Sequence, residues 1–151
     1  MNSKISAMKK LVLSSLILFS FIFSNAQAPN PVSWTFTAKK LADKTYEVHL
    51  AATVQSGWHL YSQVQPEDAI IIPTEIKFNP NPLAKLEGKV KETGKVEKFH
   101  DARLGVSANQ YAGNVDFVQV VKLKSKAKTN ITGTVEFQTC DDKKCPVVLY
   151  R

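Results

Sequence analysis

Residues that bind metals and cofactors are scarce in this chain of 151 residues, which has two cysteines, three histidines and six glycines. The single Cys-x4-Cys pair lacks the second ligand pair of a zinc ribbon, and the histidines are scattered along the chain. A glycine-rich phosphate loop is absent, and no serine stands in a nucleophile elbow. Aromatic-rich RNA-binding signatures are missing as well. The sequence therefore predicts no metal site, no bound cofactor and no nucleic-acid partner.

Long apolar runs are absent except near the N-terminus. Met1–Lys10 carries three lysines and no acidic residue, Leu11–Phe23 is almost unbroken apolar sequence, and Ser24-Asn25-Ala26 follows as a small-residue site. This order is typical of a secretory signal peptide, and the apolar run is shorter than the roughly 20 residues that span a bilayer. We expect a signal peptide at residues 1–26 and a soluble, exported domain at residues 27–151. Cleavage two residues later and an uncleaved membrane anchor are the alternatives.

The positive charge is moderate once this leader is set aside. The chain has a formal net charge of +7, from 20 Lys and Arg against 13 Asp and Glu. Three of the basic residues and none of the acidic ones precede Gln27, so the remainder carries +4. We interpret this charge as lysines on the solvent faces of strands.

Helical periodicity is missing, whereas the two-residue alternation of β-strands recurs about every dozen residues. Thr45–Val54 alternates cleanly, and Val115–Leu123 has the pattern of a central strand. Strands or strand-like segments are predicted at residues 32–37, 45–54, 58–62, 70–72, 74–78, 83–90, 115–123, 130–137 and 147–150. Turn signals between them favour a single all-β domain, an antiparallel β-sandwich.

The sequence pattern is less regular in two regions, residues 70–73 and residues 89–105. Ile70–Ile72, which Pro73 follows, is predicted to be a buried run at the edge or the entry of a strand. Residues 89–98 are polar and read as a solvated connection, and residues 99–105 read as a loop.

Both cysteines lie where the last two predicted strands turn back on each other. A tight antiparallel loop brings Cys140 and Cys145 within the Cα separation of roughly 4.4–6.8 Å that a disulfide needs. A disulfide around so small a loop contributes only about 2 kcal/mol by loop entropy, which hints at chemistry rather than stability. Lys143 and Lys144 precede Cys145, and acidic residues follow Cys140, so charge favours the thiolate at Cys145. These residues alone leave a structural staple and a redox pair equally open.

Three short motifs, in this order, carry a resemblance to a known family. They are Gly57-Trp-His-Leu-Tyr-Ser-Gln63, the segment from Phe99-His-Asp101 to Gly105, and Phe137-Gln-Thr-Cys-Asp-Asp-Lys-Lys-Cys-Pro146. The chain after the leader resembles the N-terminal, immunoglobulin-like periplasmic domain of the thiol:disulfide interchange protein DsbD. This implies an immunoglobulin-like β-sandwich in the periplasm. It also implies that electrons pass from a membrane donor, here a separate polypeptide, to oxidised thioredoxin-like proteins.

The resemblance implies roles for particular residues. Cys140 and Cys145 would be the active pair, with Cys145 entering mixed disulfides, and Tyr61 and His59 would lie beside them. Asp101 would belong to a cap loop that shields the pair. The aromatic residue of the family's cap is replaced by the stretch Ala-Arg-Leu104, so that Leu104 or an arginine stem would form a weaker shield.

A second reading stays open. The domain would then be a secreted, non-catalytic immunoglobulin-like binding module whose disulfide only braces a hairpin. Under the first reading the chain is a component of a thiol–disulfide oxidoreductase system, without a cofactor of its own.

Overall fold

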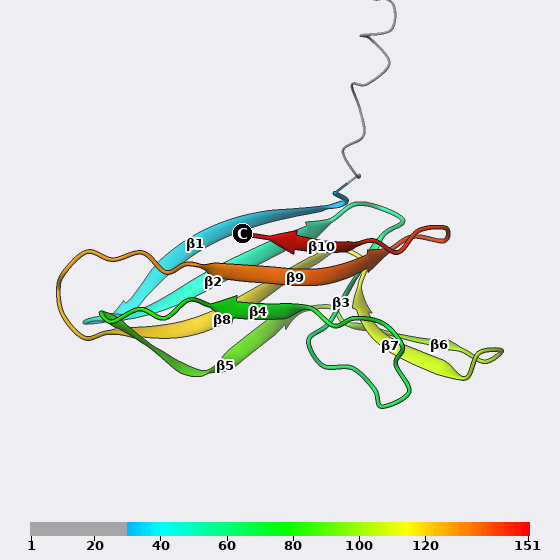
Figure 1. The fold of residues 1–151 in the computed structure, drawn as a ribbon, viewed down its shortest axis with the longest axis horizontal. Coiled ribbons are helices and arrows are strands. Elements are labelled where there is room, and N and C mark those ends of the chain that lie inside the picture. Colours follow the sequence, from blue (N-terminus) through cyan, green and yellow to red (C-terminus); the bar gives the residue numbers. More distant parts are fainter. Residues whose placement is uncertain (1–29) are drawn as a thin grey trace, which may run out of the picture.

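The computed structural model describes residues 30–151, which form ten strands in two antiparallel sheets (Figure 1). The first sheet has the order β1 (Val32–Ala42), β2 (Thr45–Val54), β8 (Asn114–Leu123) and β5 (Ala84–Gly94). The second has the order β10 (Val147–Tyr150), β9 (Gly133–Cys140), β3 (His59–Tyr61), β7 (Val106–Tyr111) and β6 (Glu97–Asp101), and β4 (Glu75–Phe78) also pairs with β9.

These residues contain no helix, which confirms the predicted all-β class and the antiparallel, immunoglobulin-like β-sandwich. It follows that residues 30–151 include no helix long and apolar enough to cross a membrane. The expected signal peptide at residues 1–26 lies outside the described residues, so it stays a prediction.

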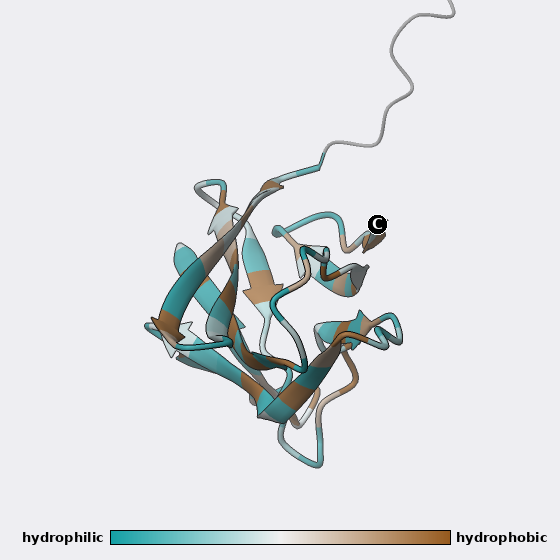
Figure 2. Ribbon diagram, turned by 90° about the vertical axis from the view of Figure 1, so that its left-hand side faces the viewer, coloured by the Kyte–Doolittle hydropathy of each residue, from teal (hydrophilic) through white to brown (hydrophobic). Residues whose placement is uncertain are grey.

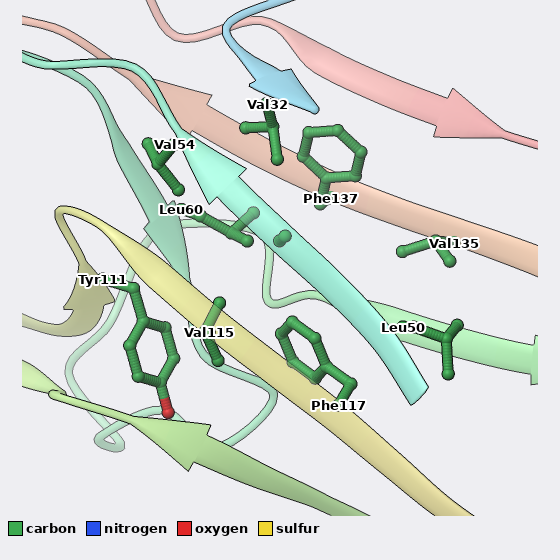
Figure 3. Packing of buried hydrophobic residues seen from close by; sticks show 10 residues of the cluster. Val32, Leu50, Val54, Leu60, Tyr111, Val115, Phe117, Val135 and Phe137 are labelled. Atoms are coloured by element: carbon green, nitrogen blue, oxygen red, sulfur yellow. The ribbon is translucent and has the colours of Figure 1, made fainter. Parts of the chain in front are cut away.

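Hydrophobic and hydrophilic residues alternate along the strands, as the colours of the ribbons in Figure 2 show. This alternation places apolar side chains between the two sheets. Side chains from β2, β3, β7, β8 and β9 gather in this core (Figure 3). The ring of Trp34 in β1 lies with its centroid 5.7 Å from that of Phe117 and 5.5 Å from that of Phe137. Because Phe117 belongs to the first sheet and Phe137 to the second, these contacts join the two layers.

The strands with the clearest sequence patterns are confirmed. The predicted strand at residues 45–54 coincides with β2, and the turn before it contains Lys44 with a φ of 57°. β8 lies between β2 and β5, as its pattern of a central strand predicts. β5 is irregular where Gly88 adopts a φ of 72° and the register with β8 shifts between Glu87 and Lys91.

The prediction for residues 70–72 is wrong. Ile70 is 75% exposed, Ile72 is also exposed, and neither belongs to a strand. Of the three isoleucines, only Ile71 is partly buried, and it packs against the small cluster that contains Cys140. An apolar run is buried only where another part of the protein covers it. This run crosses the outer face of a sheet, where much of the surface is exposed to solvent.

The interpretation of residues 89–105 is wrong in part. β5 continues to Gly94, and β6 covers Glu97–Asp101. β7 at Val106–Tyr111 was not predicted at all. The hairpin of β6 and β7 lies at an edge of the second sheet. The alternation is weak because Phe99 is the one apolar residue of β6 and because β7 buries the polar side chain of Gln110.

Candidate functional site

The disulfide lies at the end of the β9–β10 hairpin. The two strands pair antiparallel, with Val147 opposite Gln138 and Tyr150 opposite Val135. Cys140 is the last residue of β9 and is bonded to Cys145, with 4.1 Å between their Cα atoms. The hairpin and its disulfide are present as predicted, and the Cα separation is slightly shorter than the expected range of roughly 4.4–6.8 Å.

The turn between the two cysteines is organised by Asp141. Its backbone N–H donates to the carbonyl oxygen of Lys144 over 2.9 Å, and its Oδ1 accepts the backbone N–H groups of Lys143 (2.7 Å) and Lys144 (2.6 Å). These hydrogen bonds, first of all the one from Lys143, hold the pKa of Asp141 below its usual value. A carboxylate therefore stays next to Cys140 in the sequence, while the exposed lysines precede Cys145.

Cys140 and Cys145 differ in exposure because only one of them lies in a sheet. Cys140 pairs with His59 of β3 and is 5% exposed, whereas Cys145 follows the turn and is exposed. In β9, Phe137 and Thr139 are fully buried. Since successive side chains alternate, Cys140 and Gln138 point to the other, outer face of the second sheet. The disulfide thus lies on this outer face with the Cys145 side accessible.

Tyr61 and His59 share this face, as the alternation in β3 predicts. Tyr61 is buried together with Ala108 and Cys140, and burial raises the pKa of its hydroxyl. His59 is the direct cross-strand neighbour of Cys140 and is partly buried. The backbone of Tyr61 is fixed by Thr74, whose Oγ1 donates to its carbonyl oxygen over 2.5 Å.

Asp101 is the last residue of β6, and Leu104 lies in the turn from β6 to β7. Asp101 Oδ1 accepts the backbone N–H groups of Arg103 (2.8 Å) and Leu104 (3.2 Å), so this carboxylate stabilises its own turn. Leu104 is 68% exposed. Ile71 packs against the apolar cluster that contains Cys140, and the sequence analysis did not single this residue out.

Glu92 fastens the segment that carries Ile71. Its carboxylate accepts hydrogen bonds from Ser62 Oγ (2.6 Å), the backbone N–H of Gln63 (2.5 Å) and the Tyr111 hydroxyl (2.6 Å). Ser62 and Gln63 begin the connection from β3 to β4, which contains Ile71, while Glu92 belongs to the other sheet. The sequence offers no signal for this role, because Glu92 stands in a charged stretch like any surface glutamate.

The geometry of the bonded cysteines suits disulfide exchange. A buried sulfur and an accessible sulfur lie next to each other on the outer face of a sheet, with cationic side chains on the accessible side. Such a pair can exchange disulfides with another molecule, because the attacking thiolate must reach the partner and its neighbour must resolve the product.

The fold and this site define a class: β-sandwich domains with an accessible disulfide at the end of a hairpin. Within that class, the chain belongs to the family described as "Thiol:disulfide interchange protein DsbD, N-terminal", which matches residues 25–147. This confirms the resemblance. No curated protein matches the chain.

Two solved structures also match the chain. The N-terminal periplasmic domain of ScsB from Proteus mirabilis is 20% identical, with a TM-score of 0.55, over 81% of this chain. The chain spans 45% of the length of that structure, and the likeness shows the fold. A structure of the complex between the DsbD N-terminal and the PilB N-terminal domains from Neisseria meningitidis matches at 16% identity and a TM-score of 0.45, over 83% of this chain and 85% of that one.

Proposed function

We propose that this domain carries out thiol–disulfide exchange in the periplasm, receiving electrons from a membrane donor and passing them to oxidised thioredoxin-like proteins. The observation that carries the proposal is the unequal exposure of its two bonded cysteines: Cys140 is 5% exposed and Cys145 is exposed. Membership of the DsbD N-terminal family supports it. A pair that served only as a brace would gain nothing from one accessible sulfur.

In the proposed reaction, the reduced domain attacks with the Cys145 thiolate. This sulfur displaces one sulfur of the partner's disulfide and forms a mixed disulfide, while the displaced sulfur leaves as a thiolate and takes up a proton. The Cys140 thiolate then attacks the Cys145 sulfur and releases the partner as a dithiol. Two electrons have moved to the partner, and the domain holds the Cys140–Cys145 disulfide until the donor reduces it.

The surroundings favour this division of labour. Lys143 and Lys144 stabilise a thiolate at Cys145, and the ionised Asp141 disfavours one at Cys140, although solvent screens both effects. We assign Tyr61 and His59 to positioning Cys140. The turn with Asp101 and Leu104 is proposed as a cap that partners displace.

Trapping tests the proposal directly. Reduced Cys140→Ser protein is mixed with a thioredoxin variant that keeps only its exposed cysteine, activated as a mixed disulfide with 2-nitro-5-thiobenzoate. A disulfide-linked heterodimer should accumulate on a non-reducing gel, because neither protein retains a second thiol that could resolve the bond to Cys145. Cys145→Ser, in which only the buried sulfur remains, should form little or none. If neither variant forms one while both remain folded by circular dichroism, the exchange function is refuted and a non-catalytic binding module remains.

The reduction potential offers a second measurement. The reduction potential of a carrier should lie above about −300 mV, because structural disulfides of secreted proteins have potentials below that value. A value far below it would identify a permanent brace.

A further inference from the structure

The outer face of the β9–β10 ladder carries apolar residues that the core does not use. Cross-strand partners point to the same face of a sheet, so Val147 lies with Gln138, and Leu149 lies with Glu136. Val148, on the opposite face, packs against the core. Val147 and Leu149 are 48% and 49% exposed. An apolar pair is therefore open to solvent on the face that also holds the disulfide.

Ile72 extends this pair across the sheet. Its backbone N–H donates to Gln138 Oε1 over 2.7 Å, which places the residue against the same face, and its side chain is exposed. A groove of about 420 Å³ adjoins it, with Glu75 and Glu136 among its lining residues. We call Ile72, Val147 and Leu149 the outer ladder patch.

We propose that the outer ladder patch is the docking surface for the thioredoxin-like partner, an inference that rests on the proposed function. A partner must bring its own sulfur into bonding distance of Cys145. Transient redox complexes bury less than about 1,200 Å² in total, or about 600 Å² on each side, which corresponds to a disc of about 14 Å radius. Along a strand that rises about 3.3 Å per residue, Val147 lies about 7 Å and Leu149 about 13 Å from Cys145.

The position of the disulfide selects this face over the opposite one. Cys140 and Gln138 point outward from β9, whereas Thr139 between them is fully buried. A partner seated on the bonded sulfurs therefore meets Val147 first and Leu149 next. The carboxylate of Glu75 is already paired with Lys77 (2.7 Å), whereas Glu136 lies beside Leu149. The structure therefore favours a partner with an apolar rim around its cysteine and a basic side chain facing Glu136.

The test compares two leucines of equal exposure, Leu149 in the patch and Leu41, which is also 49% exposed. Leu41 lies near the β1–β2 turn, at the opposite end of the sandwich from the β9–β10 turn (Figure 1). Reduced wild type, Leu149→Ser and Leu41→Ser are each mixed with oxidised thioredoxin, and the second-order rate constant of thiol transfer is measured. The same measurement with bis(2-hydroxyethyl) disulfide, a small neutral oxidant, reports on the sulfurs without a docking surface.

We expect Leu149→Ser to slow exchange with thioredoxin about two- to fivefold, because an apolar residue near the edge of an interface contributes less than a central one. Its rate with the small disulfide and both rates of Leu41→Ser should match wild type. A wild-type rate of Leu149→Ser with thioredoxin, or an equal loss with both oxidants, would overturn the inference and leave the exchange function standing. The same holds if Leu149→Ser converts a wild-type dimer to a monomer in light scattering, since the patch would then join two copies of the chain. If the reduced wild type does not undergo thiol–disulfide exchange with thioredoxin, the proposed function fails and this inference fails with it.

Discussion

Glu92 has more influence on the fold than its place in a charged stretch suggests. Its carboxylate accepts three hydrogen bonds, from Ser62, Gln63 and Tyr111, and so ties β5 of the first sheet to the start of the β3–β4 connection and to β7. Removing an acceptor of this kind leaves donors without partners inside the structure, and hydrogen bonds to a charged group are stronger than neutral ones.

The first prediction concerns this residue. Glu92→Ala should lower the free energy of unfolding by about 2–4 kcal/mol, because three donors lose their acceptor. Urea denaturation followed by circular dichroism measures it. Glu87→Ala in the same strand is the matched control: it removes a surface ion pair with Lys85 (3.1 Å) and should cost less than about 1 kcal/mol. Equal losses in the two variants would mean that Glu92 does not join the sheets energetically.

Tyr111 gives the fold a dependence on alkaline pH. Burial and, next, the hydrogen bond to Glu92 raise the pKa of its hydroxyl. The folded protein thus holds this proton more tightly than the unfolded chain does, whose tyrosines titrate near pH 10. The stabilisation is complete below that pH and is lost as the pH rises toward the folded pKa.

We therefore predict that the free energy of unfolding falls steadily above about pH 10, and that Tyr111→Phe is less stable than wild type at pH 7 but loses less between pH 9 and 11. Denaturant midpoints at a series of pH values measure the two slopes. Identical slopes would show that another group controls alkaline unfolding.

Among the elements, β9 is shared by the core and the site. It has β10 along one edge, and β4 and β3 along the other, with Val135 and Glu136 paired on both sides. Gly133 begins this strand where β4 passes closest. A Cβ at Gly133 would collide with the carbonyl oxygen of Lys77 and lie 3.1 Å from the Cα of Phe78.

Gly133→Ala should consequently force β4 away from β9 and destabilise the domain by about 1–3 kcal/mol, as overpacking does. Gly113→Ala is the control, because a Cβ there meets nothing within 4 Å. Thermal unfolding of both variants measures the difference. A Gly133→Ala protein as stable as Gly113→Ala would mean that β4 is free to shift.

The same elements show which parts of the fold the sequence predicts. β2 and β8 are recognised because apolar residues alternate along them and turn residues mark their ends. β10 is recognised as a short run of β-prone residues after a turn. β6 and β7 are not, because β6 is mostly polar and β7 buries the polar side chain of Gln110, so that apolar residues do not alternate along them. Ile70–Ile72 is the opposite error: its composition indicates burial, yet the segment crosses an outer face.

The sequence predicts some residues of the candidate site and not others. Two cysteines near a turn are enough to predict the hairpin disulfide, since their spacing and the flanking strands fix the geometry. Ile71 and Glu92 approach the site from segments far away in the sequence, and only the folded chain brings them there. Contacts of that kind leave no local pattern.

In the whole molecule, the apolar core and the disulfide are separate structures. The main cluster between the sheets contains Phe117, Phe137 and Leu60, whereas Cys140 belongs to a second, smaller cluster with Tyr61 and Ala108 on the outer face. The disulfide closes a loop of only six residues, so it restricts the unfolded chain little. A carrier needs this separation, because its bond must break and form again while the partner-binding surface stays in place.

Reduction should therefore leave the domain folded and lower its free energy of unfolding by only about 2 kcal/mol, the loop-entropy value for a ring of this size. Denaturation with and without a phosphine reductant measures the loss, and far-ultraviolet circular dichroism of the reduced protein should keep its β signal. The Cys140→Ala/Cys145→Ala double variant provides the matched control, and its stability should equal that of the reduced wild type. If reduction instead abolishes the β signal, the bond is needed for the fold itself, and a cycle of oxidation and reduction by a folded domain becomes physically untenable.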